Sequence, residues 1–532
     1  MPYKRPPATH PLQEPAEAGP ASTANAGGGE SGTSPPSAMF RADGEPDARQ
    51  EPEQEPKQDS GQDLRSGPAG RPEEGGAPSR PVRARLRRGA LRRSQALLVS
   101  PARWRARLVF WIGALVTGLV SVAFAHAADT AQHLFGRMIS GPPWRLWATL
   151  LLTPAGFIAC ALIAWRYFPG SQGSGIPQTI AARELKGRGR LIYLSIRTAV
   201  GKILLTVAGL LCGASIGREG PTVQIGAAIM LLSARLGGMT QARGLILAGS
   251  AAGIAAAFNT PLAGIVFAIE EMGRSYHART NGLVLSTVVI AGLASLAIEG
   301  HYTYFGASQG TLALAEGLPL ILATGVAGGV LGAGFSAGAL WLTRRIRRWN
   351  PGSPARRIVA VAGIAGLVVA VAGIATHGAA FGTSYDHARA AIGGETLGPE
   401  FFLAKFAATL ASTVSGIPGG LFAPSLSVGA GLGSVIGALI GTPGGMAAVL
   451  GMAGYFAGVV QAPMTAFVIV FEMTGNHDDI LPVMATALIG YGVARILTPE
   501  PLYHGLARLW LADALRLMRS REQDNRPPSE RG

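Results

Sequence analysis

Residues 217–221 read Gly-Arg-Glu-Gly-Pro, and an apolar run follows directly. The same Gly-x-x-x-Pro spacing precedes apolar runs at 173–177 (Gly-Ser-Gly-Ile-Pro) and at 420–424 (Gly-Leu-Phe-Ala-Pro). Glycine tolerates unwound, closely approached backbone, and proline suits the first helical position, where no hydrogen bond is lost. Each stretch therefore predicts a helix N-terminus with free N–H donors and the positive end of a helix dipole. Inside a membrane, several such ends meeting at one point would bind an anion without a buried positive charge.

The composition is that of a membrane protein. Of 532 residues, 48% are hydrophobic, 14% are charged and 74 are glycine, a residue that lets membrane helices pack closely. Apolar runs long enough to cross a hydrocarbon core of about 30 Å include Leu108–Ala127, Leu146–Trp165, Leu318–Leu342, Ile358–Thr376 and Ile480–Leu497. The net charge of +15 would also suit nucleic acid. However, the arginines gather beside apolar runs, so we expect the lipid bilayer as partner and no nucleic acid.

The basic residues predict the orientation of the spans. Arginines are frequent between 80 and 107, in the loops 183–197 and 344–357 and after 510, whereas 300–317 has no Lys or Arg. By the positive-inside rule, both termini of this multi-pass protein lie in the cytoplasm. The bias toward Ala, Gly and Arg favours a bacterial inner membrane.

The chain divides into three parts. Residues 1–95 are rich in Pro, Gly, Ser, Glu and Ala, which predicts a disordered cytoplasmic extension and not a signal peptide. Residues 96–510 form the transmembrane domain, and 511–532 form a short cytoplasmic tail. Cys160 and Cys212 lie in apolar runs, which predicts buried free thiols; no metal site or cofactor is expected.

Two apolar stretches do not fit simple spans. Leu245–Ile269 has arginines on both sides and is interrupted at 259–261, which predicts a re-entrant segment. Ala199–Ser233 is interrupted at 217–221. Irregular backbone inside a membrane is tolerated only within protein or beside a water-filled cavity, so broken helices indicate a transport site.

The chain contains an internal repeat. An offset of 202 aligns Pro261 with Pro463 and Glu270 with Glu472. An offset of 203 aligns Lys202, Gly217, Pro221 and Gly226 with Lys405, Gly420, Pro424 and Gly429. We therefore expect two structural halves, at about 105–299 and 318–497. Hydropathy alone does not count the crossings between them, so it leaves open whether the halves are inverted.

Glu219 is the strongest candidate functional residue, because a carboxylate in apolar surroundings at a helix start is costly. Its charged form could occupy the anion site, and its neutral form could carry a proton. The alternative is an ion pair with Arg218, although adjacent residues seldom face each other on a helix. Glu270 and Glu271 end an apolar helix and could both be interfacial charges. The repeat suggests an architectural Glu270 and leaves Glu271 as the candidate proton relay.

Four other polar residues carry open alternatives. Ser174 could donate its hydroxyl to an anion or cap its helix. Tyr503 follows the last span, where most tyrosines are interfacial. Lys202 and Lys405 could snorkel or belong to an anion path, and their pairing in the repeat favours an architectural role.

A third class of function competes with channels and transporters. Residues 213–217 match Gly-x-Ser-x-Gly, so Ser215 could be the nucleophile of an intramembrane serine hydrolase. The strand–turn–helix context of that motif is absent, and few histidines lie in apolar runs. We therefore expect no enzyme.

These motifs resemble those of the CLC family of chloride channels and proton/chloride antiporters, over roughly residues 105–510. The Gly-x-x-x-Pro stretches match three family signatures in order. Further matches lie at 220–226, at 256–259 with 261–264, at 270–272 and at 501–503. The match is to prokaryotic-type members, without the paired C-terminal regulatory domains of eukaryotic ones.

The resemblance implies an all-α membrane protein with two inverted structural repeats, broken and re-entrant helices, and a homodimeric assembly. It also implies a central anion bound by the hydroxyls of Ser174 and Tyr503 and by backbone N–H groups of the second and third signatures. The implied anion-binding set is Ser174, Gly217, Arg218, Glu219, Gly220, Leu421, Phe422 and Tyr503.

The same resemblance implies roles for the two glutamates. Glu219 would be the outer gating glutamate and Glu271 the inner proton-transfer glutamate. Antiporters of the family generally have a carboxylate at the inner position and its channels generally lack one, so we expect exchange of chloride for protons. A passive chloride-selective channel is the alternative. Serine at 174 favours chloride over nitrate.

Overall fold

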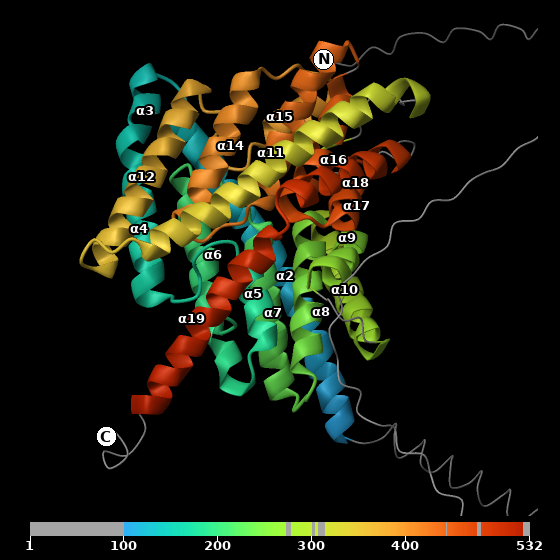
Figure 1. The fold of residues 1–532 in the computed structure, drawn as a ribbon. Coiled ribbons are helices and arrows are strands. Elements are labelled where there is room, and N and C mark those ends of the chain that lie inside the picture. Colours follow the sequence, from blue (N-terminus) through green and yellow to red (C-terminus); the bar gives the residue numbers. More distant parts are fainter. Residues whose placement is uncertain are drawn as a thin grey trace, which may run out of the picture. The chain divides into compact units, whose positions relative to one another are not determined.

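The computed structural model describes residues 101–272, 278–300, 304–306, 314–442, 444–475 and 480–524, and these contain helices and no β-strand (Figure 1). The predicted extension 1–95 lies outside the described residues. The helices are α2 (Pro101–Ile139), α3 (Pro143–Trp147), α4 (Thr149–Tyr167), α5 (Ile176–Glu184), α6 (Ile196–Leu211), α7 (Glu219–Leu236), α8 (Ala242–Phe258), α9 (Pro261–Phe267), α10 (Ala278–Glu299), α11 (Leu314–Arg348), α12 (Pro354–Ala375), α13 (Tyr385–Ile392), α14 (Pro399–Val414), α15 (Phe422–Ile440), α16 (Gly444–Val460), α17 (Pro463–Thr474), α18 (Ile480–Leu497) and α19 (Leu502–Asp524). A 3₁₀ turn, η1 (Gly187–Ile192), and a π-helical turn, η2 (Ala268–Met272), complete the set.

Eight helical segments of the described chain are long and apolar enough to cross a membrane. They include all five spans expected from hydropathy, and they add 187–211, 282–299 and 422–440. Large apolar side chains face outward from several of them: Leu151, Leu439 and Ile496 are more than 80% exposed. Such a surface would be costly in water and suits lipid. The protein is therefore a multi-pass membrane protein.

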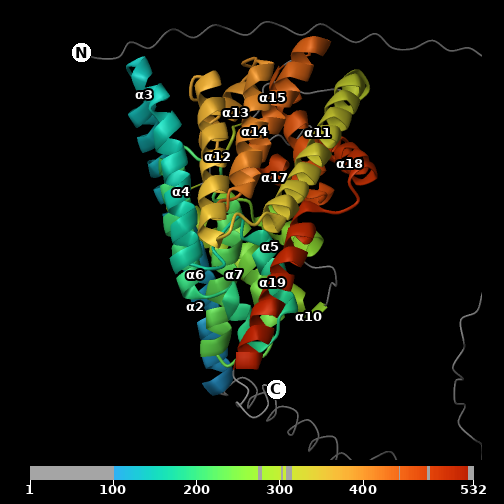
Figure 2. The same ribbon diagram turned by 60° about the vertical axis from the view of Figure 1, so that its left-hand side comes forward.

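The helices pack side by side through small residues. Figure 2 shows α12 running along α4, with which it is in contact. α7 touches α8 at Gly226 and Gly249, where an added Cβ on Gly226 would lie 2.3 Å from the Gly249 oxygen. The repeat-related pair α15 and α16 meets in the same way, and a Cβ on Gly429 would lie 2.7 Å from the Gly451 oxygen. Backbone contact of this kind is typical of membrane helices.

The predicted helix break at 259–261 is confirmed, and an equivalent break occurs in the second half of the chain. Between α8 and α9, Asn259 adopts a left-handed conformation with φ 56°, and the next helix begins at Pro261. Between α16 and α17, Gln461 has φ 55° and the next helix begins at Pro463. Each position in the second half lies 202 residues after its counterpart. The two halves thus break the chain by the same backbone geometry.

The two short helices after these breaks cap each other. The Glu472 carboxylate of α17 accepts the N–H groups of residues 262 and 263 of α9, at 3.1 and 2.7 Å. Glu270 of η2, which follows α9, accepts those of residues 464 and 465 of α17, at 3.1 and 2.6 Å. The exchange is reciprocal, and the residues in it are related by the offset of 202. The architectural role expected of Glu270 follows from it.

The C-terminal helix crosses the boundary expected at 510. α19 continues without a break to Asp524, so the predicted tail 511–532 begins inside a helix. Tyr193 donates its hydroxyl hydrogen bond to the Trp510 carbonyl (2.7 Å), and Arg347 pairs with Asp513 (2.7 Å). These contacts hold the helix against η1 and α11, a long-range effect that composition does not reveal.

We predict that Glu472→Gln destabilises the fold by about 1–3 kcal/mol, because an amide cannot accept two N–H bonds as a carboxylate does. The measurement is the thermal unfolding midpoint of purified protein in detergent. Exposed Glu395 supplies the control variant Glu395→Gln, which should leave the midpoint unchanged. Equal midpoints for the two variants would contradict the capping role.

Candidate anion site

Backbone hydrogen bonds join the loops that precede α5, α7 and α15. Gly217 and Gly420 exchange two N–H···O bonds, each 2.7 Å long. Gly173 donates to the Ile417 carbonyl at 3.0 Å and accepts from the Gly419 N–H at 3.1 Å. The three helix starts are therefore brought together, although they come from distant parts of the sequence. We call this meeting point, formed by residues 173–177, 217–221 and 420–424, the junction.

The helices of the junction begin slightly earlier than expected. α5 starts at Ile176, α7 at Glu219 and α15 at Phe422, so the three prolines occupy the second or third helical position. The expectation of the first position was wrong. The physical premise still holds, because the first N–H groups of a helix have no intrahelical partner wherever the proline stands among them.

The side chain of Glu219 lies within the junction. It is fully buried, and its Oε1 accepts a hydrogen bond from the Tyr385 hydroxyl at 2.6 Å. Its Oε2 makes no hydrogen bond of standard geometry, but the carboxylate interacts with the N–H groups of Glu219 itself and of Ala423. A Cβ on Gly217 would lie 2.2 Å from Oε2, so glycine is needed there. The carboxylate thus lies between the N-termini of α7 and α15, where their dipoles favour negative charge.

Two buried hydroxyls adjoin this position. Ser174 and Tyr503 lie close enough to interact, yet among the described residues neither hydroxyl makes a hydrogen bond of standard geometry. The Phe422 ring packs against Tyr503, with centroids 6.0 Å apart. Buried hydroxyls are costly when they lack a partner, so a pair beside helix N-termini suits an anionic ligand. The arrangement could bind a small anion through hydroxyl and backbone donors alone.

The Arg218 side chain has other hydrogen-bond partners than its neighbour Glu219. It is the N-cap residue of α7, and its guanidinium donates to Asp129 (2.6 Å), to the Ala125 carbonyl (2.7 Å) and to the Tyr304 hydroxyl (2.9 Å). Its ion pair is thus with α2 and not with Glu219. Within the junction, Arg218 and Leu421 occupy equivalent N-cap positions, before α7 and before α15.

Glu271 lies apart from the junction, in the π-helical turn η2. It is buried, and its Oε1 lies 3.4 Å from His504 Nδ1. A cavity of about 230 Å³ adjoins His504 and is also lined by Met272 and Arg183, among others. The carboxylate is therefore placed to exchange a proton with His504, which faces the cavity. His504 was not singled out from the sequence, although it follows Tyr503 directly.

The two lysines of the repeat hold loops. Lys202 donates to the Gly173 carbonyl at 2.7 Å, within the first signature. Lys405 donates to the carbonyls of Ala380 (3.1 Å) and Gly382 (2.6 Å), just before α13. Both side chains are fully buried, and the ammonium group of each donates hydrogen bonds to backbone carbonyl oxygens. This geometry fits the architectural role.

Ser215 is engaged in packing. Its hydroxyl pairs with that of Thr409 at 3.0 Å, and its N–H donates to Ser412 at 3.2 Å. Neither partner is a general base, so the hydrolase alternative gains no support here. Cys160 and Cys212 are both free thiols; Cys160 is buried and Cys212 is half-buried.

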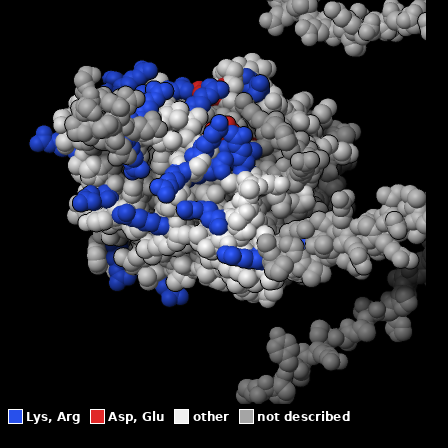
Figure 3. Space-filling view, turned by 90° about the horizontal axis from the view of Figure 1, so that it is seen from below, with Lys and Arg blue, Asp and Glu red and all other residues white. Residues whose placement is uncertain are grey.

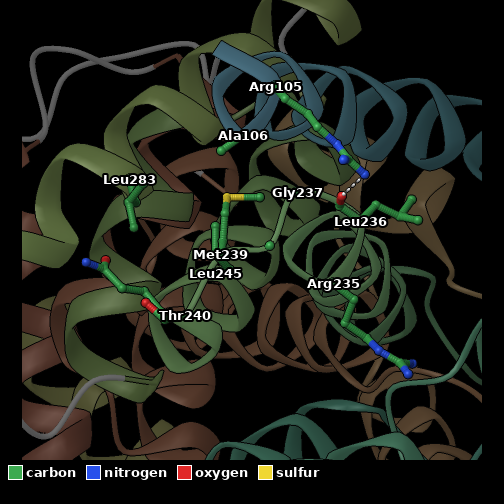
Figure 4. A pocket seen from close by; sticks show the side chains of 11 residues that line it. Arg105, Ala106, Arg235, Leu236, Gly237, Met239, Thr240, Leu245 and Leu283 are labelled. Atoms are coloured by element: carbon green, nitrogen blue, oxygen red, sulfur yellow. Dashed lines mark hydrogen bonds between the residues drawn. The ribbon is translucent and has the colours of Figure 1, made fainter. Parts of the chain in front are cut away.

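Other surface features lie away from the junction. A cavity of about 750 Å³ between α2, the α7–α8 loop and α10 is lined by Arg105, Arg235 and Met239, among others, and contains no predicted site residue (Figure 4). Lys and Arg side chains are spread over one face of the molecule, with few Asp or Glu visible among them (Figure 3). The visible face is thus predominantly basic.

Comparison with known proteins supplies the family. The model of the voltage gated chloride channel family matches residues 155–495, more than half of the chain. The chain belongs to the CLC family. The H(+)/Cl(-) exchange transporter ClcA of Citrobacter koseri is 32% identical over 419 residues, which cover 75% of this chain and 87% of that relative. ClcA of Yersinia pestis is 31% identical over 425 residues, covering 75% and 86%.

Solved CLC structures share the fold. A slow cyanobacterial Cl⁻/H⁺ antiporter superposes with a TM-score of 0.66 at 26% identity, covering 77% of this chain and 98% of the other. A eukaryotic CLC transporter gives 0.63 at 23% identity, covering 76% and 75%. The expected family and the all-helical CLC fold are therefore confirmed.

We predict that Gly220→Ala disrupts the junction, because its Cβ would lie 2.5 Å from Ser174 Oγ and 3.2 Å from the Gly420 Cα. Overpacking of this kind costs about 1–3 kcal/mol, which should lower the thermal unfolding midpoint in detergent. Gly334 of α11 is exposed and has open space around its Cβ position, so Gly334→Ala is the control. A wild-type midpoint for Gly220→Ala would contradict the close packing of the junction.

Proposed function

We propose that this CLC protein exchanges chloride for protons across a membrane. The observation that carries the proposal is the Glu219 carboxylate, held between the N-termini of α7 and α15 beside two buried hydroxyls. A site that accommodates a carboxylate through backbone N–H groups also suits a halide ion. An acid that alternates between charge and neutrality at such a site links anion binding to a proton.

Chloride is bound, in this proposal, by the hydroxyls of Ser174 and Tyr503 and by backbone N–H groups at the start of α15, including those of Leu421 and Phe422. Backbone donors of 217–220 complete the site. No lysine or arginine side chain is needed, since Lys202 is bonded to a carbonyl and Arg218 is paired with Asp129. The ion is held by dipoles and can therefore leave.

Glu219 is the gate. Its carboxylate competes with chloride for the N–H groups of the junction, and protonation removes the charge that keeps it there. The neutral side chain then leaves, and chloride enters. Each release of the carboxylate therefore takes up one proton, and each return gives it up.

Glu271 passes protons between Glu219 and the cytoplasm. It is buried next to His504 and the adjoining cavity, and it is close enough to Tyr503 for the two groups to interact electrostatically. The proton thus leaves the anion path on its way to the cytoplasm. The basic ends of α11 and α19 support a cytoplasmic position for that side and for both termini.

Relatives support exchange over conduction. The ClcA proteins are named H(+)/Cl(-) exchange transporters, and the cyanobacterial structure is titled a Cl⁻/H⁺ antiporter. By analogy with the family, the protein acts as a homodimer in the lipid bilayer, with one pathway in each subunit. The bacterial inner membrane is the proposed location. No enzymatic step and no cofactor enter the mechanism.

We predict that Ser174→Ala weakens chloride binding about tenfold or more, because a hydrogen bond to a charged group contributes about 1.5–3 kcal/mol. Calorimetric titration of the detergent-purified protein with chloride measures the Kd. Ser250→Ala removes a buried hydroxyl of α8 that donates to the Ile246 carbonyl, and it should leave the Kd unchanged. Equal affinities of Ser174→Ala and wild type would rule out the hydroxyl as a ligand.

The proposed function is tested by paired chloride and proton fluxes in liposomes with an outward chloride gradient. The wild-type protein should take up protons against their gradient as chloride leaves. Glu219→Gln should abolish proton movement while chloride still flows, because the amide has no proton to exchange. Glu271→Gln should reduce proton movement and preserve chloride flux.

Two outcomes would overturn parts of this proposal. Wild-type chloride flux without linked proton movement would establish the passive channel and remove the role given to Glu271. Normal proton pumping by Glu219→Gln would show that the gate lies elsewhere. Glu395→Gln is the control for the charge change, since Glu395 is exposed on the loop after α13.

A further inference from the structure

A chain of polar groups runs from the protein surface to the gate. Asp129 of α2, whose side chain is 43% exposed, pairs with the buried Arg218 at 2.6 Å. Arg218 donates to the Tyr304 hydroxyl at 2.9 Å, and that hydroxyl interacts with the one of Tyr385. Tyr385 donates to Glu219 Oε1 at 2.6 Å. The two tyrosines thus link the buried Arg218 to the Glu219 carboxylate.

The direction of these hydrogen bonds follows from what each group can donate. A guanidinium has only donors, so the Tyr304 oxygen accepts from Arg218 and keeps its own hydrogen for Tyr385. The Tyr385 hydrogen is then directed at Glu219, whose ionised carboxylate has acceptors and no donor. All donors point the same way, from a cation toward a carboxylate. Hydrogen bonds in such a series polarise and strengthen one another.

The tyrosines are held firmly in place. Their rings pack edge to face with centroids 4.3 Å apart, and both are more than 90% buried. Arg389 of α13 donates to the Tyr304 carbonyl at 2.6 Å, which ties Tyr304 to the helix that begins with Tyr385. Lys405 holds the preceding loop through Gly382. The Tyr385 hydroxyl is therefore presented to the gate by a rigid support.

We propose that Tyr385 is a positioning residue for the gate, whose hydroxyl holds the Glu219 carboxylate in the junction and so sets the pH at which the gate opens. The inference rests on the proposed function, since it assumes that Glu219 leaves the junction when protonated. Tyr304 and Arg218 orient the hydroxyl, and Asp129 balances the buried cation at the surface end.

The expected effect has a definite sign. The Tyr385 hydrogen bond favours the charged form of Glu219, which closes the path, so its loss makes protonation and opening easier. With such a gate, chloride flux is expected to fall as pH rises, and in the variant it should persist to higher pH. Among the described residues, the other ionisable or charged groups around Glu219 are Arg218 at the N-cap of α7, Tyr304 beside Tyr385, and Tyr503 on α19. None of them changes in Tyr385→Phe.

The test is the pH dependence of chloride efflux from liposomes that contain the full-length protein. Tyr385→Phe should move the midpoint upward by about one pH unit, the size expected for one hydrogen bond to a carboxylate. Tyr304→Phe should move it less, in the same direction. The control is Tyr455→Phe, which removes a buried hydroxyl of α16 that has no hydrogen bond among the described residues and should leave the midpoint unchanged.

A double variant separates positioning from packing. In the Glu219→Gln background there is no carboxylate to hold, so Tyr385→Phe should add no further change in pH dependence. A wild-type midpoint for Tyr385→Phe, or an equal shift with and without the carboxylate, would overturn the proposal and leave the gate intact. If Glu219→Gln itself kept the wild-type pH dependence and proton coupling, the proposal that Glu219 is the gate would be wrong. The role proposed for Tyr385 would then be wrong as well.

Discussion

The paired N–H···O bonds between Gly217 and Gly420 are the constraint on which the site depends. They join the two halves of the chain at their equivalent signatures, and they bring the N-termini of α7 and α15 to the same point. Helix dipoles aligned in this way would repel one another without negative charge between them. In the structure that charge is the Glu219 carboxylate, and in the proposed cycle it is alternately the carboxylate and chloride. Close packing of glycines is needed because side chains would separate the two backbones.

Residues that the repeat pairs with each other have the same structural role in both halves. Glu270 and Glu472 each cap the short helix of the other half, so neither carboxylate is available for transport. Lys202 holds the first signature, and Lys405 holds the loop before α13, which carries Tyr385. Glu219 and Glu271 fall outside this scheme: neither aligns with a second glutamate. The two glutamates to which we assign transport roles thus lie where the repeat has no equivalent residue.

Local patterns predicted much of this arrangement. The three signatures, the break at Asn259 and the offset of about 202 residues all follow from glycine, proline and polar residues in apolar runs, and the fold confirms them. The exact helix starts were misplaced, because proline is tolerated at several early helical positions. Tyr385 and His504 were missed, since a tyrosine 166 residues from Glu219 is brought to it only by tertiary packing. The same holds for the pairing of Arg218 with Asp129. The spacing of residues along the chain does not predict such tertiary contacts.

The central claim is that the junction of helix N-termini binds the transported anion. Crystals grown in bromide, with anomalous diffraction recorded at the bromine edge, would test it most directly. The account predicts a bromide peak within hydrogen-bonding distance of the Ser174 and Tyr503 hydroxyls and of N–H groups at the start of α15, and a stronger peak nearer Gly217 in Glu219→Gln. Bromide found only at surface arginines, with none in the junction of either protein, would contradict it.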